Sequence, residues 1–175
     1  GVIMATHDPD QAFLCADRNF TVFRSLYRGK TSPSHLFWGS FDLAVTRFSG
    51  RRAPVHPGGV PHLSDAVTRE AYSHEVISAG FWPGGGGFEE AAFYAYAYPT
   101  PEGLAKCGIE PAEAAWHAQL GEFLLPYAAV RSAPDPDGMV QQFLQSTFAA
   151  AAALLDWPGD AVIGPTPSYG SPPPA

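Results

Sequence analysis

Four residues that can carry charge lie inside stretches of apolar, aromatic and β-branched sequence: Asp42, Arg47, His74 and Glu75. An unpaired charge in such a stretch is costly, so each of these groups needs a partner or contact with solvent. In a catalytic interpretation, His74 forms an acid–base pair with Asp42 or Glu75. Arg47 then binds an anionic group of the substrate. In the other interpretation the four residues form a structural network of ion pairs and hydrogen bonds, which shifts pKa values without catalysis.

Aromatic residues form a second set of candidates. Three tyrosines alternate with other residues over 92–98, so a strand there places all three on one face. Together with Trp38, Tyr72 and Trp82 they could line a groove with polar handles, which is typical of a small-ligand pocket. Alternatively, these side chains pack under a helix or against another part of the protein. The candidate ligand-binding residues from both sets are Trp38, Asp42, Arg47, Tyr72, His74, Glu75 and Tyr96.

Motifs for metals, phosphates and nucleophiles are weak. His35 and His74 with Glu75, or His56 with His62, have side chains that suit zinc or iron. Neither set has the spacing of a recognised metal motif, so we predict no metal site. A four-glycine run (GGGGFEE) lacks the lysine of a phosphate-binding loop, and no serine or cysteine stands in a recognised nucleophile motif. These patterns identify no cofactor.

Composition narrows the classes of partner and location. The 175 residues carry a net charge of -7, which argues against nucleic acid or an anionic membrane surface as a partner. The longest apolar run, at 148–155, is far shorter than the roughly 20 residues of a membrane-spanning helix. Cys15 and Cys107 are too few for a disulfide framework, so we expect free thiols and a cytoplasmic protein.

Periodicity and capping signals predict the elements that position these residues. An Asp-Pro start and apolar residues spaced three or four apart predict a helix over 9–28. Residues 35–48 have the composition of a strand or a bulged pair of strands. Within them, Phe37, Phe41, Leu43 and Val45 share the predicted core face. The opposite face carries Trp38, Ser40, Asp42 and Thr46.

The rest of the chain alternates between loops and further elements. Residues 49–65 are predicted to be loop, strands are predicted at 69–82, 92–98 and 121–130, and a second helix over 135–155. This order indicates an α+β domain over 7–157, with an antiparallel sheet of about four strands packed against an N-terminal and a C-terminal helix. The Pro/Gly/Ser-rich residues 158–175 are predicted to be a disordered tail.

Five segments resemble one bacterial family: 35–51 (HLFWGSFDLAVTRFSGR), 70–75 (EAYSHE), 80–85 (GFWPGG), 92–97 (AFYAYA) and 121–127 (GEFLLPY). This family is the domain-of-unknown-function family 5996, and the resemblance extends over 8–157. It implies that the chain corresponds to the C-terminal half of a longer domain. The missing N-terminal half would carry strands of its own that pair with this sheet. The partners considered are that half or further copies of the chain in a homo-oligomer. The resemblance implies no activity, cofactor or catalytic residue.

Two classes of function remain. The first is a domain that binds a small molecule or a partner through its aromatic and polar sheet face. The second is an enzyme that uses His74, Glu75 and Asp42. Clustering of these three side chains with Arg47 around an open cavity would favour the enzyme, whereas mutual salt bridges among them would favour the binding domain.

Overall fold

The computed structural model describes residues 9–60, 63–85 and 88–158. Six antiparallel strands form one sheet in the order β1-β2-β3-β4-β6-β5. The strands are β1 (His35–Phe37), β2 (Asp42–Arg52), β3 (His74–Trp82), β4 (Ala92–Tyr98), β5 (Ala115–His117) and β6 (Glu122–Pro126). The α+β class is therefore confirmed, with six strands instead of the expected four.

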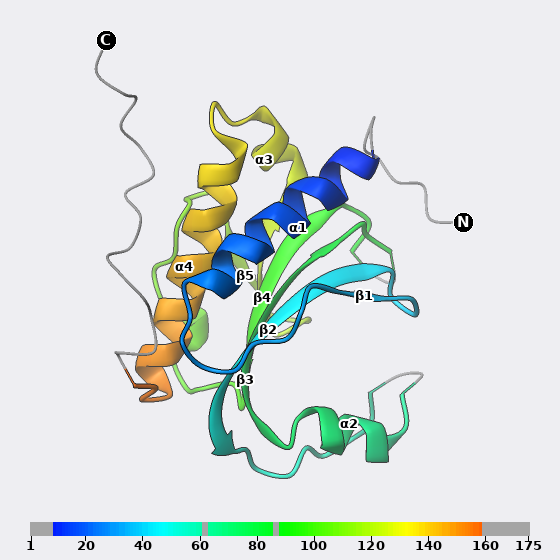
Figure 1. Ribbon diagram of the computed structural model, residues 1–175, viewed down its shortest axis with the longest axis vertical. Helices are drawn as coiled ribbons and strands as arrows, with labels where there is room; N and C mark the ends of the chain where they lie inside the picture. The colour runs from blue at the N-terminus through cyan, green and yellow to red at the C-terminus, as the bar shows by residue number, and fades with distance from the viewer. Residues whose placement is uncertain (1–8, 61–62, 86–87, 159–175) are drawn as a thin grey trace.

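Three helices cover one face of this sheet (Figure 1). They are α1 (Pro9–Ser25), α3 (Tyr127–Ser132) and α4 (Pro136–Leu154). The short helix α2 (Asp65–Ala71) precedes β3 and lies apart from the other three (Figure 1), and a single 3-10 turn, η1, spans Leu104–Lys106. The sheet thus has one face covered by helices, here called the core face, and an opposite face, here called the open face.

The two long helices follow their predicted patterns closely. Ala16, Phe20 and Phe23 form the buried stripe of α1, as the spacing predicts. Asp135 caps α4, because its carboxylate accepts the backbone N–H of Gly138 at 3.0 Å. Both predicted starts are confirmed to within one residue, and α1 ends three residues earlier than expected.

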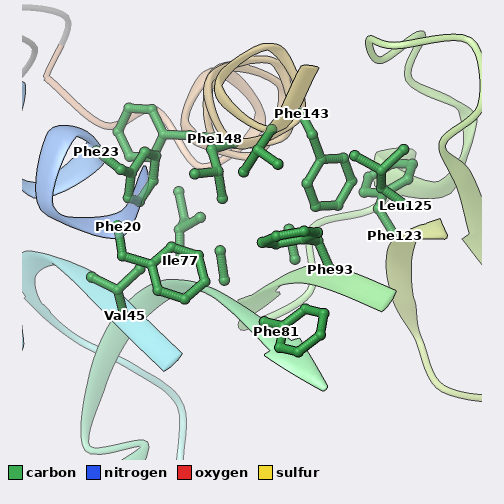
Figure 2. Close-up of a cluster of buried hydrophobic side chains, with 14 of the residues drawn as sticks. Phe20, Phe23, Val45, Ile77, Phe81, Phe93, Phe123, Leu125, Phe143 and Phe148 are labelled. Atoms are coloured by element: carbon green, nitrogen blue, oxygen red, sulfur yellow. The ribbon is translucent and has the colours of Figure 1, made fainter. Parts of the chain in front are cut away.

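Aromatic packing between the helices and the sheet forms the core (Figure 2). The rings of Phe20 in α1 and Phe93 in β4 meet edge to face with centroids 6.3 Å apart. The core residues labelled in Figure 2 are Phe20, Phe23, Val45, Ile77, Phe81, Phe93, Phe123, Leu125, Phe143 and Phe148. The strand residues among them all have odd residue numbers, because odd-numbered positions of these strands point to the core face.

The predicted core face of residues 35–48 is wrong at its N-terminal end. A tight turn over 38–41 separates β1 from β2, and Phe41 in this turn has a left-handed φ of 57°. Alternation cannot be counted through such a turn, since the chain reverses there. Phe37 pairs with Asp42 and therefore lies on the open face, where it is 50% exposed, and Phe41 is 40% exposed. Only Val45 of the four predicted core residues is fully buried, and Leu43 packs against the core.

Three further boundaries differ from the predictions. The first residues of the predicted strand 69–82 belong to α2, which Ser64 caps, and β3 begins only at His74. Predicted strand 121–130 ends at Pro126, whose missing N–H suits the start of α3. The predicted loop begins too early, because β2 continues to Arg52, and the three-residue β5 was not predicted. Residues 159–175 of the predicted tail lie outside the described residues.

Candidate ligand-binding site

The open face carries polar and aromatic side chains where the core face is apolar. Strand alternation points Thr46 of β2, Ser78 of β3 and Tyr96 of β4 to this side, and strand pairing places the three in one row across the sheet. The described helices α1, α3 and α4 all pack on the core face, so polar side chains here avoid burial beneath a helix. The sequence therefore builds a sheet with two chemically different sides.

A cavity of about 520 Å³ lies over the open face. Two smaller cavities, of about 320 Å³ and 180 Å³, adjoin it and share Tyr96 as a wall. We refer to the three together as the open-face cleft. The residues that line the largest cavity are Ser32, Pro33, His35, Phe37, Ser40, Asp42, Ala44, Thr46, Phe48, Leu63, Ala71, Tyr72, Val76, Ser78, Tyr94 and Tyr96.

Asp42 is the buried carboxylate of the cleft. It begins β2, is 8% exposed and accepts hydrogen bonds from the hydroxyls of Ser40 and Tyr94. The Tyr94 side chain starts on β4 and crosses over Gly80 of β3 to reach Asp42 on β2. A Cβ atom at position 80 would overlap with the Tyr94 ring and hydroxyl. Glycine at this position therefore allows the hydrogen bond between Tyr94 and Asp42.

Glu122 supplies a second carboxyl group to the cleft. It begins β6 and lines both smaller cavities. Burial, and after it the negative charge of Asp42, raise the pKa of Glu122 from 4.5 to about 7. The pKa of Tyr94 is also raised well above its usual value, first by burial and then by Asp42. Glu122 is therefore a proton-binding group of the cleft with a pKa near neutral pH.

Hydroxyl groups connect the strands with the segment after α2. The hydroxyls of Thr46 and Ser78 lie 2.9 Å apart, and those of Tyr72 and Tyr96 lie 3.0 Å apart. Tyr72 follows the last residue of α2, and its ring stacks on His56 with centroids 4.9 Å apart. These contacts hold the loop segment against the sheet and fix the tyrosine hydroxyls at the cleft wall.

The structure brings some of the sequence-predicted candidates together and separates others. Asp42, Tyr72 and Tyr96 all line the largest cavity. Trp38 lies in the turn between β1 and β2, is 79% exposed and is absent from the lining of all three cavities. His74, at the start of β3, contacts the hydroxyl of the adjacent Ser73 through Nδ1 at 3.2 Å.

Glu75 takes part in a structural contact at the edge of β2. Its carboxylate pairs with Arg51 at 2.9 Å and accepts the Ser49 hydroxyl at 2.8 Å. Arg51 also donates to the backbone carbonyls of Leu155 and Asp156, which follow α4. Glu75 thus helps to join the sheet to the C-terminal end of α4.

Arg47 lies on the core face and is fully buried. Its guanidinium carbon is 3.4 Å from the ring centroid of Phe23 and 4.2 Å from that of Phe148. Nη2 donates to the backbone carbonyl of Phe23, whereas Nε and Nη1 have no hydrogen-bond partner among the described residues. Burial lowers the pKa of Arg47 to about 9. A grouping of Arg47 with Asp42, His74 and Glu75 around one cavity, which would have favoured an enzyme, is therefore not observed.

Neither a metal site nor a membrane span appears in the described ranges. Over those residues, no group of three or more histidine, cysteine, aspartate or glutamate side chains is arranged to hold a metal ion. In the same part of the chain, none of the helices has both the length and the apolar character that crossing a bilayer requires. His62, one of the considered metal ligands, lies outside the described residues.

The model of the Family of unknown function (DUF5996) matches residues 4–163. The chain belongs to this family. Because the match spans nearly the whole chain, restricting the resemblance to the C-terminal half of the DUF5996 domain was wrong. Searches of the curated proteins and of the solved structures found no match.

Several residues of this DUF5996 cleft were missing from the candidates predicted by sequence. Ser40 and Ser78 were outside the set. Tyr94 was expected to share the groove face with Tyr96, and it lines the same cavity, but it was not among the seven ligand-binding candidates. Glu122 was missed because its strand carries no alternating polar pattern. Its place near Asp42 depends on the strand order β2-β3-β4-β6, which joins residues far apart in the sequence.

Proposed function

We propose that the protein binds a small organic molecule in the open-face cleft. The observation that carries this proposal is the cavity of about 520 Å³, whose wall combines aromatic rings with the buried carboxylate of Asp42. Small-molecule sites are typically concave and about 300–1,000 Å³ in volume, with largely apolar walls and a few placed polar groups. The cleft has this size and composition.

The polar groups of the cleft are already held in place by the protein. Ser40 and Tyr94 orient Asp42, and Tyr72 orients the Tyr96 hydroxyl. Groups fixed by their neighbours on strands lose little entropy when a ligand binds, which favours affinity and selectivity. These contacts support a site for recognising a ligand.

The arrangement favours binding over the alternative of an enzyme, in which His74 pairs with Asp42 or Glu75 for acid–base chemistry and Arg47 binds an anionic group. Glu75 is occupied by Arg51 and Ser49, and Arg47 lies on the other side of the sheet. A general base must lie within hydrogen-bonding reach of the proton that it removes. Of the residues in this alternative, Asp42 lines the cleft, whereas His74, Glu75 and Arg47 do not line it. A substrate bound in the cleft would therefore not contact all four side chains.

Two alanines of α2 provide a matched test. Ala71 lines the largest cavity, whereas Ala66 is exposed on the same helix and does not line it. We expect a fragment library, screened by ¹H–¹⁵N spectra, to shift the amide signals of Ala44, Ser78 and Tyr96. Ala71→Trp should weaken the best fragment by at least about tenfold through obstruction of the cavity, and Ala66→Trp should leave its affinity unchanged. Shifts confined to other surfaces, or equal effects of both variants, would contradict the proposal.

We also propose a reducing compartment, the cytoplasm, as the location of the protein. Cys15 and Cys107 are both free thiols. Free cysteines persist more readily where glutathione and thioredoxin keep thiols reduced. Burial raises the pKa of Cys15 to about 11, so its thiol reacts slowly. Alkylation of Cys107 in intact cells, without prior reduction, is the expected result.

A further inference from the structure

The buried carboxylate of Asp42 has hydroxyl donors but no basic partner in the described parts of the chain. The salt bridges found there join Arg18 to Asp137, Arg51 to Glu75 and Arg69 to Asp65. Hydrogen bonds from Ser40 and Tyr94 stabilise a carboxylate, yet they leave its net charge in place. A buried charge of this kind is stabilised further when an opposite charge approaches it.

The rest of the cleft is also short of positive charge. No lysine or arginine is among the residues that line the three cavities, and Glu122 adds a second carboxyl group. Behind the lining, the Lys30 ammonium lies 5.2 Å from the ring centroid of Phe48, whereas none of the salt bridges above involves Asp42. His35 and His56 are the titratable bases of the lining, and the His56 ring stacks on Tyr72. An anionic ligand would therefore meet like charge from Asp42, whereas a cation would meet attraction.

Aromatic walls add to this preference for a cation. Phe37, Phe48 and Tyr72 line the same cavity as Asp42, and Phe37 is half exposed there. The faces of aromatic rings carry partial negative charge and attract ammonium groups, while their area also binds apolar groups. The cavity thus offers a charged floor for an ammonium group and an apolar wall for the rest of a molecule.

We propose that the ligand of the open-face cleft is an organic amine, with its ammonium group at Asp42 and its apolar or aromatic body against Phe37, Phe48 and Tyr72. This inference rests on the proposed function and specifies the chemical class of its ligand. The positive charge enters the protein with the ligand. An alcohol of the same shape would leave Asp42 without a counter-charge, and a carboxylate would place two negative charges together.

Three probes of similar shape and different charge test this inference: 2-phenylethylamine, 2-phenylethanol and 3-phenylpropionate. Their affinities are measured by titration monitored at the amide signals of Ala44, Ser78 and Tyr96. The amine should bind at least about tenfold more tightly than the alcohol, the advantage expected of a hydrogen bond to a charged group, and the carboxylate should bind weakest. Raising the ionic strength should reduce the advantage of the amine.

A charge-matched pair of variants locates the effect. Asp42→Asn keeps a side chain of the same shape and should abolish the preference for the amine over the alcohol. Glu113→Gln is the control, because it makes the same change in net charge at an exposed residue outside the cleft. If Asp42→Asn lowers stability, the comparison of the three probes on the unmodified protein still decides the question.

Each outcome separates this inference from the proposed function. Equal affinities of the amine and the alcohol at the cleft would overturn the amine inference and leave ligand binding intact. Absence of shifts with all three probes would overturn it as well, while the fragment screen independently decides whether the cleft binds small molecules of another class. An amine preference that Glu113→Gln removes as effectively as Asp42→Asn would mean that the attraction comes from the overall charge of the protein.

Discussion

Strand β2 buries one charged side chain on each face of the sheet, and the two lie in very different surroundings. Arg47 on the core face is enclosed by the rings of Phe23, Phe148 and Tyr27, with centroids 3.4, 4.2 and 5.1 Å from its guanidinium carbon. Asp42 on the open face is held by two hydroxyls and borders a cavity of about 520 Å³. Burial is nearly complete for both side chains, at 0% and 8% exposed.

The difference shows which buried charge can serve a ligand. Arg47 has no adjoining cavity among those that we describe, so its interactions are all made within the fold. Stacked rings and the long alkyl stem of arginine allow it to act as packing. Asp42 has space beside it, so its charge is available to a molecule from outside. Burial alone therefore does not distinguish a structural charge from a binding group, whereas an adjoining cavity does.

The largest expected effect comes from shortening Arg47. Arg47→Ala removes a long side chain from a filled space, and we expect the free energy of unfolding to fall by about 2–5 kcal/mol. Arg47→Met keeps most of the volume and removes the desolvated charge, so its stability should stay within about 1 kcal/mol or rise. Urea denaturation of the two variants provides the measurement.

This pair also tests the assignment of roles to the two faces. Neither substitution should change the affinity of the amine probe, provided that the variant is folded at the temperature of the titration. If Arg47→Met is as destabilising as Arg47→Ala, the guanidinium contributes through its charge and through its hydrogen bond to Phe23 instead of through packing. A loss of probe binding in a folded Arg47→Met variant would contradict the separation of the two faces.

The next effect is a pH dependence caused by Glu122. Its pKa is about 7 in the folded protein against an ordinary value of 4.5. Between these values the folded state holds a proton that the unfolded chain has released, so stability falls as pH rises through that range. The decrease in the free energy of unfolding is complete above the pKa of the folded state and amounts to at most about 3 kcal/mol. Contact of Glu122 with solvent makes the decrease smaller.

Glu122→Gln should remove this part of the pH dependence. Its free energy of unfolding should change less between pH 5 and pH 8 than that of the unmodified protein, with Glu113→Gln as the exposed control. Glu122 shares one cavity with Asp42, Tyr94 and Tyr96 and another with His56, Tyr72 and Tyr98, and His117 pairs with it on β5. Identical pH profiles for the two glutamine variants would show that Glu122 titrates normally and that the cleft is well solvated.

The sequence predicts much of the core face because local patterns determine it. The buried side of α1 is predicted by the apolar stripe through Ala16, Phe20 and Phe23. The start of α4 is predicted by the capping residue Asp135. Alternation over 92–98 predicts β4 without error. The prediction fails at Phe37 and Phe41, since the reversal between β1 and β2 interrupts the alternation on which it depends.

The open-face cleft is harder to predict because it depends on pairing between distant strands. Asp42, Tyr72 and Tyr96 were recognised from their residue types, and they do line one cavity. The approach of Glu122 to Asp42 requires the order of four strands, which no local pattern specifies. The separation of Arg47 from Asp42 follows from simple alternation along β2, since their positions differ by an odd number of residues.

The smallest of the three effects tests how the cleft keeps Asp42 in place. Gly80→Ala puts a methyl group where the Tyr94 ring crosses β3, so the ring must move away from Asp42. We expect a loss of stability of about 1–3 kcal/mol from overpacking and from the broken hydrogen bond. The ¹³C chemical shift of the Asp42 carboxyl group should change in the same variant.

Tyr94→Phe should change the Asp42 carboxyl shift by a similar amount with a smaller loss of stability, because it removes the hydroxyl without the overlap. Gly108→Ala is the control, since an added Cβ there meets no atom within 4 Å. An Asp42 shift that responds to Tyr94→Phe but not to Gly80→Ala would mean that the ring adapts to the methyl group, and that glycine at position 80 is not required for the contact.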